Sequence, residues 1–174
     1  MKTRFIAALL ITITLIMTLA SCDTLPNIGG ADNGGADNGG DVVSLFEVDI
    51  ESYKNSADES VRDVFANINS VKIKNETDYV IEVNSRGFKD FTIKVTIGAD
   101  GKIVNAETVS NNETMGDDLM KDGGYNANFI NKTKAECAEV DLVAGCTVTT
   151  SGYKKAVLTA FSAYEIINGV NQED

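Results

Sequence analysis

The chain has 174 residues, no histidine, three cysteines and a formal net charge of −11 at pH 7. The absence of histidine excludes histidine-based catalytic triads, histidine zinc ligands and histidine proton shuttles. The excess of acidic residues repels polyanions and argues against nucleic acid as a partner.

The first 21 residues have the pattern of a secretory signal peptide. Lys2 and Arg4 precede an uncharged apolar run over residues 5–20, which is too short to favour a membrane-spanning helix. The run ends at Leu19-Ala20-Ser21-Cys22, which is similar to a bacterial lipobox. We therefore expect Cys22 to be the lipidated first residue of a mature chain, held at the extracytoplasmic face of the cell membrane. The alternative is a cleaved signal peptide in which Cys22 is coincidental.

Residues 22–42 are predicted to form a flexible tether after the lipidated cysteine. They contain a five-residue near-repeat of glycine, alanine, aspartate and asparagine, and the repeat has no bulky apolar side chain. Such a repeat cannot bury enough surface to offset the entropy of ordering, and about twenty residues of this kind span roughly 25 Å. Residues 43–174 then supply enough chain for a single domain.

The domain is predicted to begin with a helix over residues 58–68. Apolar side chains recur there at helical spacing and share one face. Either Ser56 or Asp58 is a suitable cap for its first turn.

An antiparallel meander is predicted next. Residues 79–83 and 91–97 alternate between apolar and polar side chains, which is typical of strands with one buried face. Residues 98–101 predict a turn, and residues 103–109 return as a further strand.

The last strong element is a helix over residues 153–167. Ser151 is its expected N-cap and Gly169 its expected end, while the polar residues 111–128 favour a loop or a short helix. The expected fold class is therefore α+β, with an antiparallel β-meander sheet packed with helices.

Few motifs in the chain carry chemistry of their own. There is no CxxC, no P-loop and no G-x-G-x-x-G before a helix, and no metal site is predicted. Redox chemistry would have to come from a cofactor or from Cys137 and Cys146. Residues 141–151 do place the hydroxyl of Thr147 beside Gly145 at the start of a helix, where backbone N–H groups favour an anion such as a phosphate.

Two segments resemble the FMN-binding domain family, which includes flavoprotein subunits of sodium-pumping NADH:quinone oxidoreductase and of ferredoxin:NAD oxidoreductase. Residues 87–103 and 112–116 are similar to the family's G-F/Y motif, strand, D-G-K-I hairpin and E-T-P-G loop. Residues 141–151 are similar to its pattern D-x-x-S/T-G-A-T followed by x-T-S. The resemblance covers about residues 76–168, with order and spacing preserved.

The resemblance implies a covalent flavin. A flavin transferase, which uses FAD and a divalent metal, would esterify Thr147 with the phosphate of FMN and would read Asp141 together with that threonine. Glu113 and Thr114 match the loop that lies near the cofactor in such domains. The cofactor-binding residues implied in this way are Asp141, Gly145, Cys146, Thr147, Glu113 and Thr114.

Three departures from the family pattern keep an alternative open. Ala144 replaces a serine or threonine, Cys146 replaces an alanine, and Met115 stands where proline is common. Loss of the hydroxyl at position 144 would weaken recognition by the transferase, leaving FMN bound without a covalent link or not bound at all. In that reading Thr147 is an ordinary residue of a loop-to-helix junction, and Glu113 is a solvent carboxylate or a cap for a short helix.

Eight residues separate Cys137 from Cys146, so a disulfide between them is geometrically allowed in an exported chain. The bridge would contribute roughly 2–3 kcal/mol by closing a loop of this length. The alternative is two small buried thiols. The aromatic side chains of Phe88, Tyr125 and Phe129 are expected in the core rather than beside a flavin ring.

The expected function is electron transfer. The chain would be a lipid-anchored flavoprotein that carries electrons through FMN on Thr147, rather than an enzyme acting alone. Its expected partners are the flavin transferase, a membrane oxidoreductase or other redox protein, and the membrane itself. The alternative is an accessory lipoprotein of the same fold without covalent flavin.

Overall fold

The computed structural model describes residues 44–114, 116–121 and 123–169. The predicted signal peptide, the lipidation site at Cys22 and the tether lie outside these residues. Within the described part of the chain, no helix is both long enough and apolar enough to cross a membrane.

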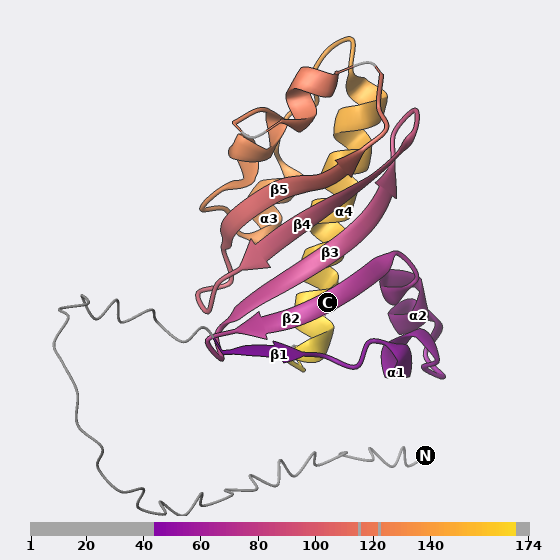
Figure 1. Cartoon of the computed structure of the whole chain (residues 1–174), viewed down its shortest axis with the longest axis vertical. Helices are drawn as coiled ribbons and strands as arrows, with labels where there is room; N and C mark the ends of the chain where they lie inside the picture. The colour runs from indigo at the N-terminus through magenta and orange to yellow at the C-terminus, as the bar shows by residue number, and fades with distance from the viewer. Residues whose placement is uncertain (1–43, 115, 122, 170–174) are drawn as a thin grey trace, which may run out of the picture. The chain divides into compact units, whose positions relative to one another are not determined.

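An antiparallel five-stranded sheet forms the centre of the domain (Figure 1). The strands pair in chain order, each with the next one along the chain, so the sheet is a meander. The strands are β1 (Leu45–Glu47), β2 (Ile68–Lys74), β3 (Asp78–Arg86), β4 (Asp90–Ile97) and β5 (Ile103–Asn111). The predicted strands and their antiparallel order are confirmed, and the fold class is α+β.

The buried face of the sheet follows from the alternation in the sequence. Successive side chains of a strand point to opposite faces, so a strict alternation puts one apolar row inside. Ile81 pairs with Val95, and Val95 pairs with Ala106, which carries this apolar row across three strands. All four apolar residues of β4 are buried, as predicted: Phe91, Ile93, Val95 and Ile97.

The long helix α4 (Thr147–Ile167) covers this buried face and packs mainly against β3 and β4 (Figure 1). Small side chains such as Ala156 and Ala160 let the helix approach the sheet closely. At the far end, the hydroxyl of Tyr79 donates to Asn168 Oδ1 at 2.8 Å. The C-terminal end of α4 is therefore held against the sheet.

A cluster of aromatic rings fills the core near the beginning of α4. Tyr153 stacks on Phe91 and Phe129, with ring centroids 6.2 Å and 5.7 Å apart. Tyr125 meets both Phe129 and Tyr153 edge to face. Burial of such rings contributes strongly to stability, so the start of α4 lies in a rigid part of the core.

Shorter helices complete the domain at both ends of the meander. α1 (Glu51–Lys54) and α2 (Glu59–Phe65) connect β1 to β2. Two 3-10 helices and one α-helix connect β5 to α4: η1 (Asp117–Met120), η2 (Tyr125–Phe129) and α3 (Lys134–Ala138).

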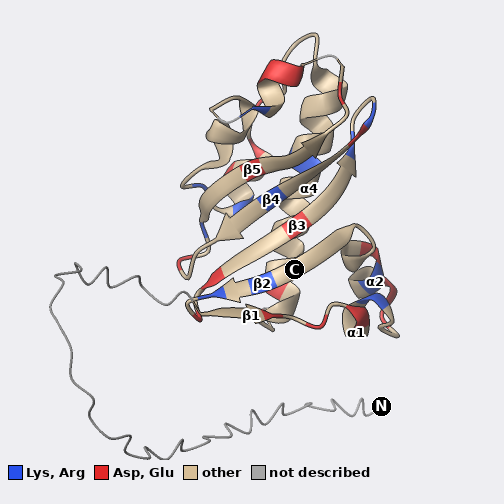
Figure 2. Ribbon diagram, in the orientation of Figure 1, with Lys and Arg blue, Asp and Glu red and all other residues tan. Residues whose placement is uncertain are grey.

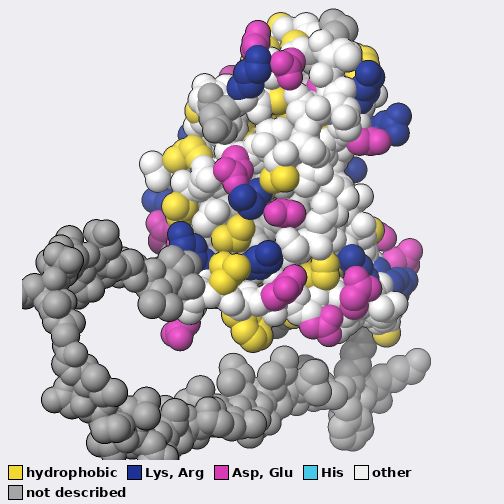
Figure 3. Space-filling model, viewed as in Figure 1, with side chains coloured by type: hydrophobic (Ala, Val, Ile, Leu, Met, Phe, Trp, Pro, Cys, Tyr) yellow, Lys and Arg dark blue, Asp and Glu magenta, His cyan; other side chains and the backbone are white. Residues whose placement is uncertain are grey.

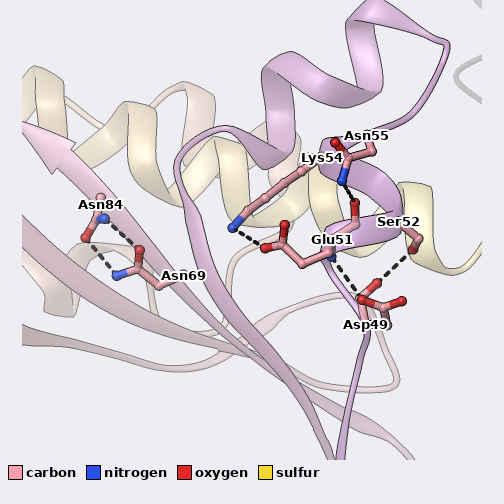
Figure 4. A network of polar contacts seen from close by, with 7 residues as sticks. All are labelled: Asp49, Glu51, Ser52, Lys54, Asn55, Asn69 and Asn84. Carbon is pink, nitrogen blue, oxygen red and sulfur yellow. Dashed lines mark hydrogen bonds and ion pairs between the residues drawn. The ribbon is translucent and has the colours of Figure 1, made fainter.

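Local polar contacts fix the first connection (Figure 4). Asp49 Oδ1 accepts from the backbone N–H of Glu51, and Asn55 Nδ2 donates to the Glu51 carbonyl at 2.9 Å. Asn69 of β2 and Asn84 of β3 exchange two amide hydrogen bonds of 2.8 Å and 2.6 Å. These bonds satisfy polar groups at the helix start and at the strand ends.

The face of the sheet opposite α4 is mixed in charge. The strands carry both acidic and basic residues, coloured red and blue on the ribbon in Figure 2, and Lys94 of β4 forms an ion pair with Glu107 of β5. Hydrophobic side chains are scattered among the charged ones on this side rather than gathered in one patch (Figure 3). Such a mixture is typical of the exposed face of an antiparallel sheet.

Two predicted helix boundaries are wrong. The first helix ends at Phe65, because Ile68 pairs with Val83 and opens β2. Its cap is Asp58, whose side chain accepts from Ser60 N–H at 2.9 Å. The last helix begins at Thr147, so Ser151 lies inside its second turn and is not its cap.

Candidate functional site

The candidate site lies at the beginning of α4. Gly145 has φ of +81°, a left-handed conformation that glycine adopts without strain and that turns the chain into the helix. Cys146 is the N-cap, and Thr147 is the first residue of the helix, with an exposed side chain. The predicted juxtaposition of the Thr147 hydroxyl and Gly145 at a helix start is confirmed.

The first turn of α4 offers donors to an anion. Among the residues that the structure describes, no side chain caps its N-terminus. The free N–H groups of a 21-residue helix and its dipole together favour a negative group at this end. A phosphate held next to Thr147 would therefore be stabilised by the helix itself.

The segment before the helix is tied to α4 by side chains of that helix. Thr150 Oγ1 accepts from the N–H of Val143 at 3.2 Å and donates to the carbonyl of Cys146 at 3.0 Å. One turn further, Lys154 Nζ donates to the carbonyl of Val140 at 3.0 Å. The loop that presents Thr147 is thus held in a fixed position.

Asp141, the leading residue of the attachment pattern, is exposed, and its backbone is anchored. The hydroxyl of the buried Tyr125 donates to the Asp141 carbonyl at 3.0 Å. Burial, and secondarily the charge of Asp141, raises the pKa of Tyr125 to about 12. Tyr125 is therefore a neutral donor that leaves the Asp141 carboxylate facing solvent.

The hairpin between β3 and β4 meets the first turns of α4. A Cβ on Gly87 would clash with Glu113 Oε1 and would lie 2.8 Å from Thr149 Cα. One turn along, a Cβ on Gly152 would lie 2.5 Å from the carbonyl oxygen of Arg86. Because these two positions carry no side chain, α4, the β3–β4 hairpin and the loop after β5 can pack in direct contact.

Among the buried polar atoms that lack a hydrogen-bond partner within the described part of the chain, two lie next to Gly87. Glu113 is 6% exposed, and its Oε1 accepts from Lys89 N–H at 3.1 Å, but its Oε2 is unpaired. Thr149 is fully buried, and its Oγ1 is also unpaired. An unsatisfied buried group costs about 1–3 kcal/mol, which a bound polar ligand would recover.

The two cysteines of the domain are free thiols, so the disulfide considered from the sequence is not formed. Cys137 is fully buried in the core, where burial raises its pKa to about 11. Cys146 faces the loop after β5 instead, and its Sγ lies 3.2 Å from the Cβ position of Gly116. The two side chains lie in different environments, although they are close together in the sequence.

Apolar side chains are exposed around the same helix start. Phe88, beside Gly87, is 52% exposed, and Val148 and Leu142 are exposed to a similar degree. Tyr125 and Phe129 are core residues as expected, whereas the expectation of a core position is wrong for Phe88. Exposed apolar groups next to an anion site suit a ligand with a phosphate at one end and a planar ring at the other.

Residues 87–162 match the model of the FMN-binding domain. These residues belong to the FMN-binding domain family. The cofactor of the domain is therefore FMN. No curated protein matches the chain.

The matched region contains every part of the site. It begins at Gly87 in the β3–β4 hairpin, includes Glu113 and Thr114 after β5, and ends within α4. The residues of the matched region fit FMN. An uncapped helix start is available to its phosphate, and two unpaired buried polar atoms lie beside that helix start. Thr114 follows Glu113 and is exposed.

The sequence alone did not identify Thr149 or Gly152. In the sequence, Thr149 is one of several neighbouring hydroxyl residues. Only the three-dimensional structure shows that its side-chain oxygen is buried without a partner. The Thr-Thr-Ser-Gly run that follows Val148 was the one available signal, since small residues permit close packing.

Proposed function

We propose that this protein is an electron-carrying flavoprotein in which the phosphate of FMN is esterified to Thr147. The position of Thr147 carries the proposal. Its hydroxyl is exposed at the first residue of an uncapped 21-residue helix, next to a glycine in the left-handed conformation. A transferase has access to that hydroxyl, and the product phosphate stays on the helix dipole.

The attachment step is a phosphoryl-type transfer. The Thr147 hydroxyl oxygen forms a bond to the phosphorus of the FMN half of FAD, and the diphosphate P–O bond breaks. AMP leaves, and the hydroxyl proton passes to a base of the transferase. The exposed carboxylate of Asp141 and the turn at Gly145 are the features of this chain that such an enzyme would contact.

Within the carrier, this chain holds and orients the cofactor. FMN supplies the electron-accepting ring. Phe88 and Val148 provide apolar surface for a planar group, and the interlocked glycines keep the hairpin at a fixed distance from α4. The proposed role is therefore electron carriage between a membrane oxidoreductase and an extracytoplasmic acceptor. The signal-peptide pattern and Cys22 support the proposed membrane anchoring.

A second candidate is a domain of the same family that binds FMN without the covalent link. Ala144 lacks the hydroxyl of the family pattern, and Cys146 places a larger side chain against Gly116. Both changes flank Gly145, where the transferase would bind.

One experiment distinguishes the two candidates. The full-length chain is produced together with a flavin transferase, denatured, and examined in the gel for flavin fluorescence. We expect fluorescence for the wild type and for Ser151→Ala, which removes an exposed hydroxyl one turn away, and none for Thr147→Ala. Fluorescence that survives Thr147→Ala rejects the attachment point. A dark wild-type band from a yellow native protein favours the non-covalent candidate.

A further inference from the structure

We infer that a basic cleft on the outer side of α4 binds an acidic, extended segment of a partner protein. The cleft consists of two concavities, of about 570 Å³ and 370 Å³, which share the side chains of Lys155 and Thr159. The first extends to Arg86 of β3, and the second extends to Val64 of α2 and to Leu142 of the loop before α4. The inference goes beyond the proposed function, because it requires neither FMN nor its attachment.

The cleft follows the stripe of α4 that faces away from the sheet. The helix residues that line the second concavity recur at helical spacing: Ser151, Lys154, Lys155, Leu158, Thr159 and Ser162. Residues between them, such as Ala156 and Ala160, are buried. The helix rises by roughly 16 Å from the first to the last residue of this stripe. An extended peptide of about five residues has the same length.

The cleft is basic, although the chain has a formal net charge of −11. Arg86, Lys154 and Lys155 line it, together with a single carboxylate, that of Asp90. By contrast, the concavity beside α3 is lined by one lysine and three acidic residues. Salt screens charges beyond about 8 Å at physiological ionic strength, so a ligand in the cleft interacts mainly with the nearby cations. The charge of the cleft therefore favours an acidic ligand.

The cations of the cleft are available to such a ligand. The Lys155 side chain is exposed, and it forms no hydrogen bond or ion pair with the other residues that the structure describes. Arg86 pairs with Asp90 at 3.5 Å, but the two side chains are 73% and 74% exposed, and an ion pair of this kind contributes little to stability. A ligand carboxylate can thus bind these cations without breaking a buried interaction.

The remaining lining of the cleft suits a peptide. Val64 and Leu158 are half-buried, and Leu142 is 42% exposed, so apolar surface lies beside the lysines. The side-chain amide of Asn67 bonds to none of the described residues, and an amide both donates and accepts, as a peptide backbone requires. An acidic segment with one apolar side chain matches this combination, whereas an inorganic anion has no apolar part.

The position of the cleft relates it to the candidate site. Ser151, at one end of the cleft, follows Thr147 by about one helical turn. A protein held by its acidic segment in the cleft would therefore lie beside the start of α4.

The test uses the full-length chain and three dye-labelled peptides, followed by fluorescence anisotropy at physiological ionic strength. The probe is Asp-Glu-Leu-Glu-Asp, and the controls are the neutral Asn-Gln-Leu-Gln-Asn and the basic Lys-Lys-Leu-Lys-Lys. We expect the acidic peptide to bind at least about tenfold more tightly than either control. Lys155→Gln should weaken its binding by about tenfold, the equivalent of one charge-assisted hydrogen bond.

Matched variants separate the cleft from the overall charge. Lys102→Gln removes the same charge from an exposed lysine between β4 and β5, outside the cleft, and should leave the binding of the acidic peptide unchanged. Lys155→Arg keeps the charge and should retain binding. A carbodiimide should join a carboxylate of the peptide directly to the Lys155 amine, and mass spectrometry locates the crosslink.

Four results would overturn the inference. Two of them are equal affinities for the acidic and neutral peptides, and unchanged binding in Lys155→Gln. The third is displacement of the peptide by an equal concentration of citrate, which would show that any polyvalent anion suffices. The fourth is tighter binding after removal of residues 170–174, which would assign the cleft to the acidic residues of this chain, Glu173 and Asp174, rather than to a partner. None of them bears on the covalent link, which the in-gel fluorescence decides separately.

Discussion

Gly87 leaves no room for a side chain between Glu113 and the first turn of α4. We expect Gly87→Ala to lower the free energy of unfolding by about 1–3 kcal/mol, because the added methyl group must displace a buried carboxylate or the helix backbone. Denaturation in urea measures the change. Gly101→Asn is the matched control, since a Cβ at Gly101 meets nothing within 4 Å and asparagine tolerates its left-handed backbone. Equal stability of Gly87→Ala and the wild type would contradict this packing.

At the level of elements, α4 approaches β3 through Gly152. Glycine to alanine normally stabilises a helix interior by about 1 kcal/mol. Here the new Cβ would lie 2.5 Å from the Arg86 carbonyl oxygen, and overpacking against backbone costs about 1–3 kcal/mol, so we expect Gly152→Ala to be destabilising. The midpoint of thermal unfolding shows whether Gly152→Ala stabilises or destabilises the protein. The exposed neighbour Ser151→Ala should be neutral or slightly stabilising, and a rise for Gly152→Ala as well would show that helix propensity prevails.

The elements that could be predicted are those with a strong internal pattern. β4 alternates without interruption, and Tyr153–Ile167 repeats at helical spacing, so both were found from the sequence. The first turn of α4 was missed because Thr147, Val148, Thr149 and Thr150 are β-branched and favour a helix weakly. Burial of Thr149 beside Gly87 of the hairpin, and of Thr150 against the segment before the helix, overrides that local preference.

The candidate site was predictable to a similar extent. Thr147, Gly145 and Glu113 follow from the family motifs, and the structure brings their segments to the same end of α4. Thr149 and the packing of Gly152 depend on contacts between residues that lie far apart in the sequence, which no local pattern records. β1 was missed for another reason: it has three residues, too few for any periodicity.

For the molecule as a whole, two buried side chains, the Cys137 thiol and the Tyr125 phenol, contribute to a loss of stability at high pH. The pKa of Cys137 is raised from 9.0 to about 11, and that of Tyr125 from 10.0 to about 12, in both cases chiefly by burial. The unfolded chain releases these two protons at a lower pH than the folded chain does. The contribution of the two groups to the free energy of unfolding is therefore fully present below pH 9 and is lost as the pH rises toward 11 and 12.

The urea midpoint should therefore fall between pH 9 and pH 12. Cys137→Ala and Tyr125→Phe should each flatten part of that decline, Cys137→Ala at the lower pH and Tyr125→Phe at the higher. Cys146→Ala is the matched control for a thiol outside the core. A midpoint that does not change with pH, or the same slope in all variants, would disagree with the burial of these two groups.

The firm anchoring of α4 at both ends has a consequence for kinetics. Its first residue is Thr147, and the residue that follows its last turn, Asn168, accepts a hydrogen bond from Tyr79 of the sheet. A cofactor on Thr147 would be attached to a backbone that has no hinge of its own. Electron tunnelling falls steeply with distance, so the transfer rate would depend on how the whole domain is oriented toward its partner.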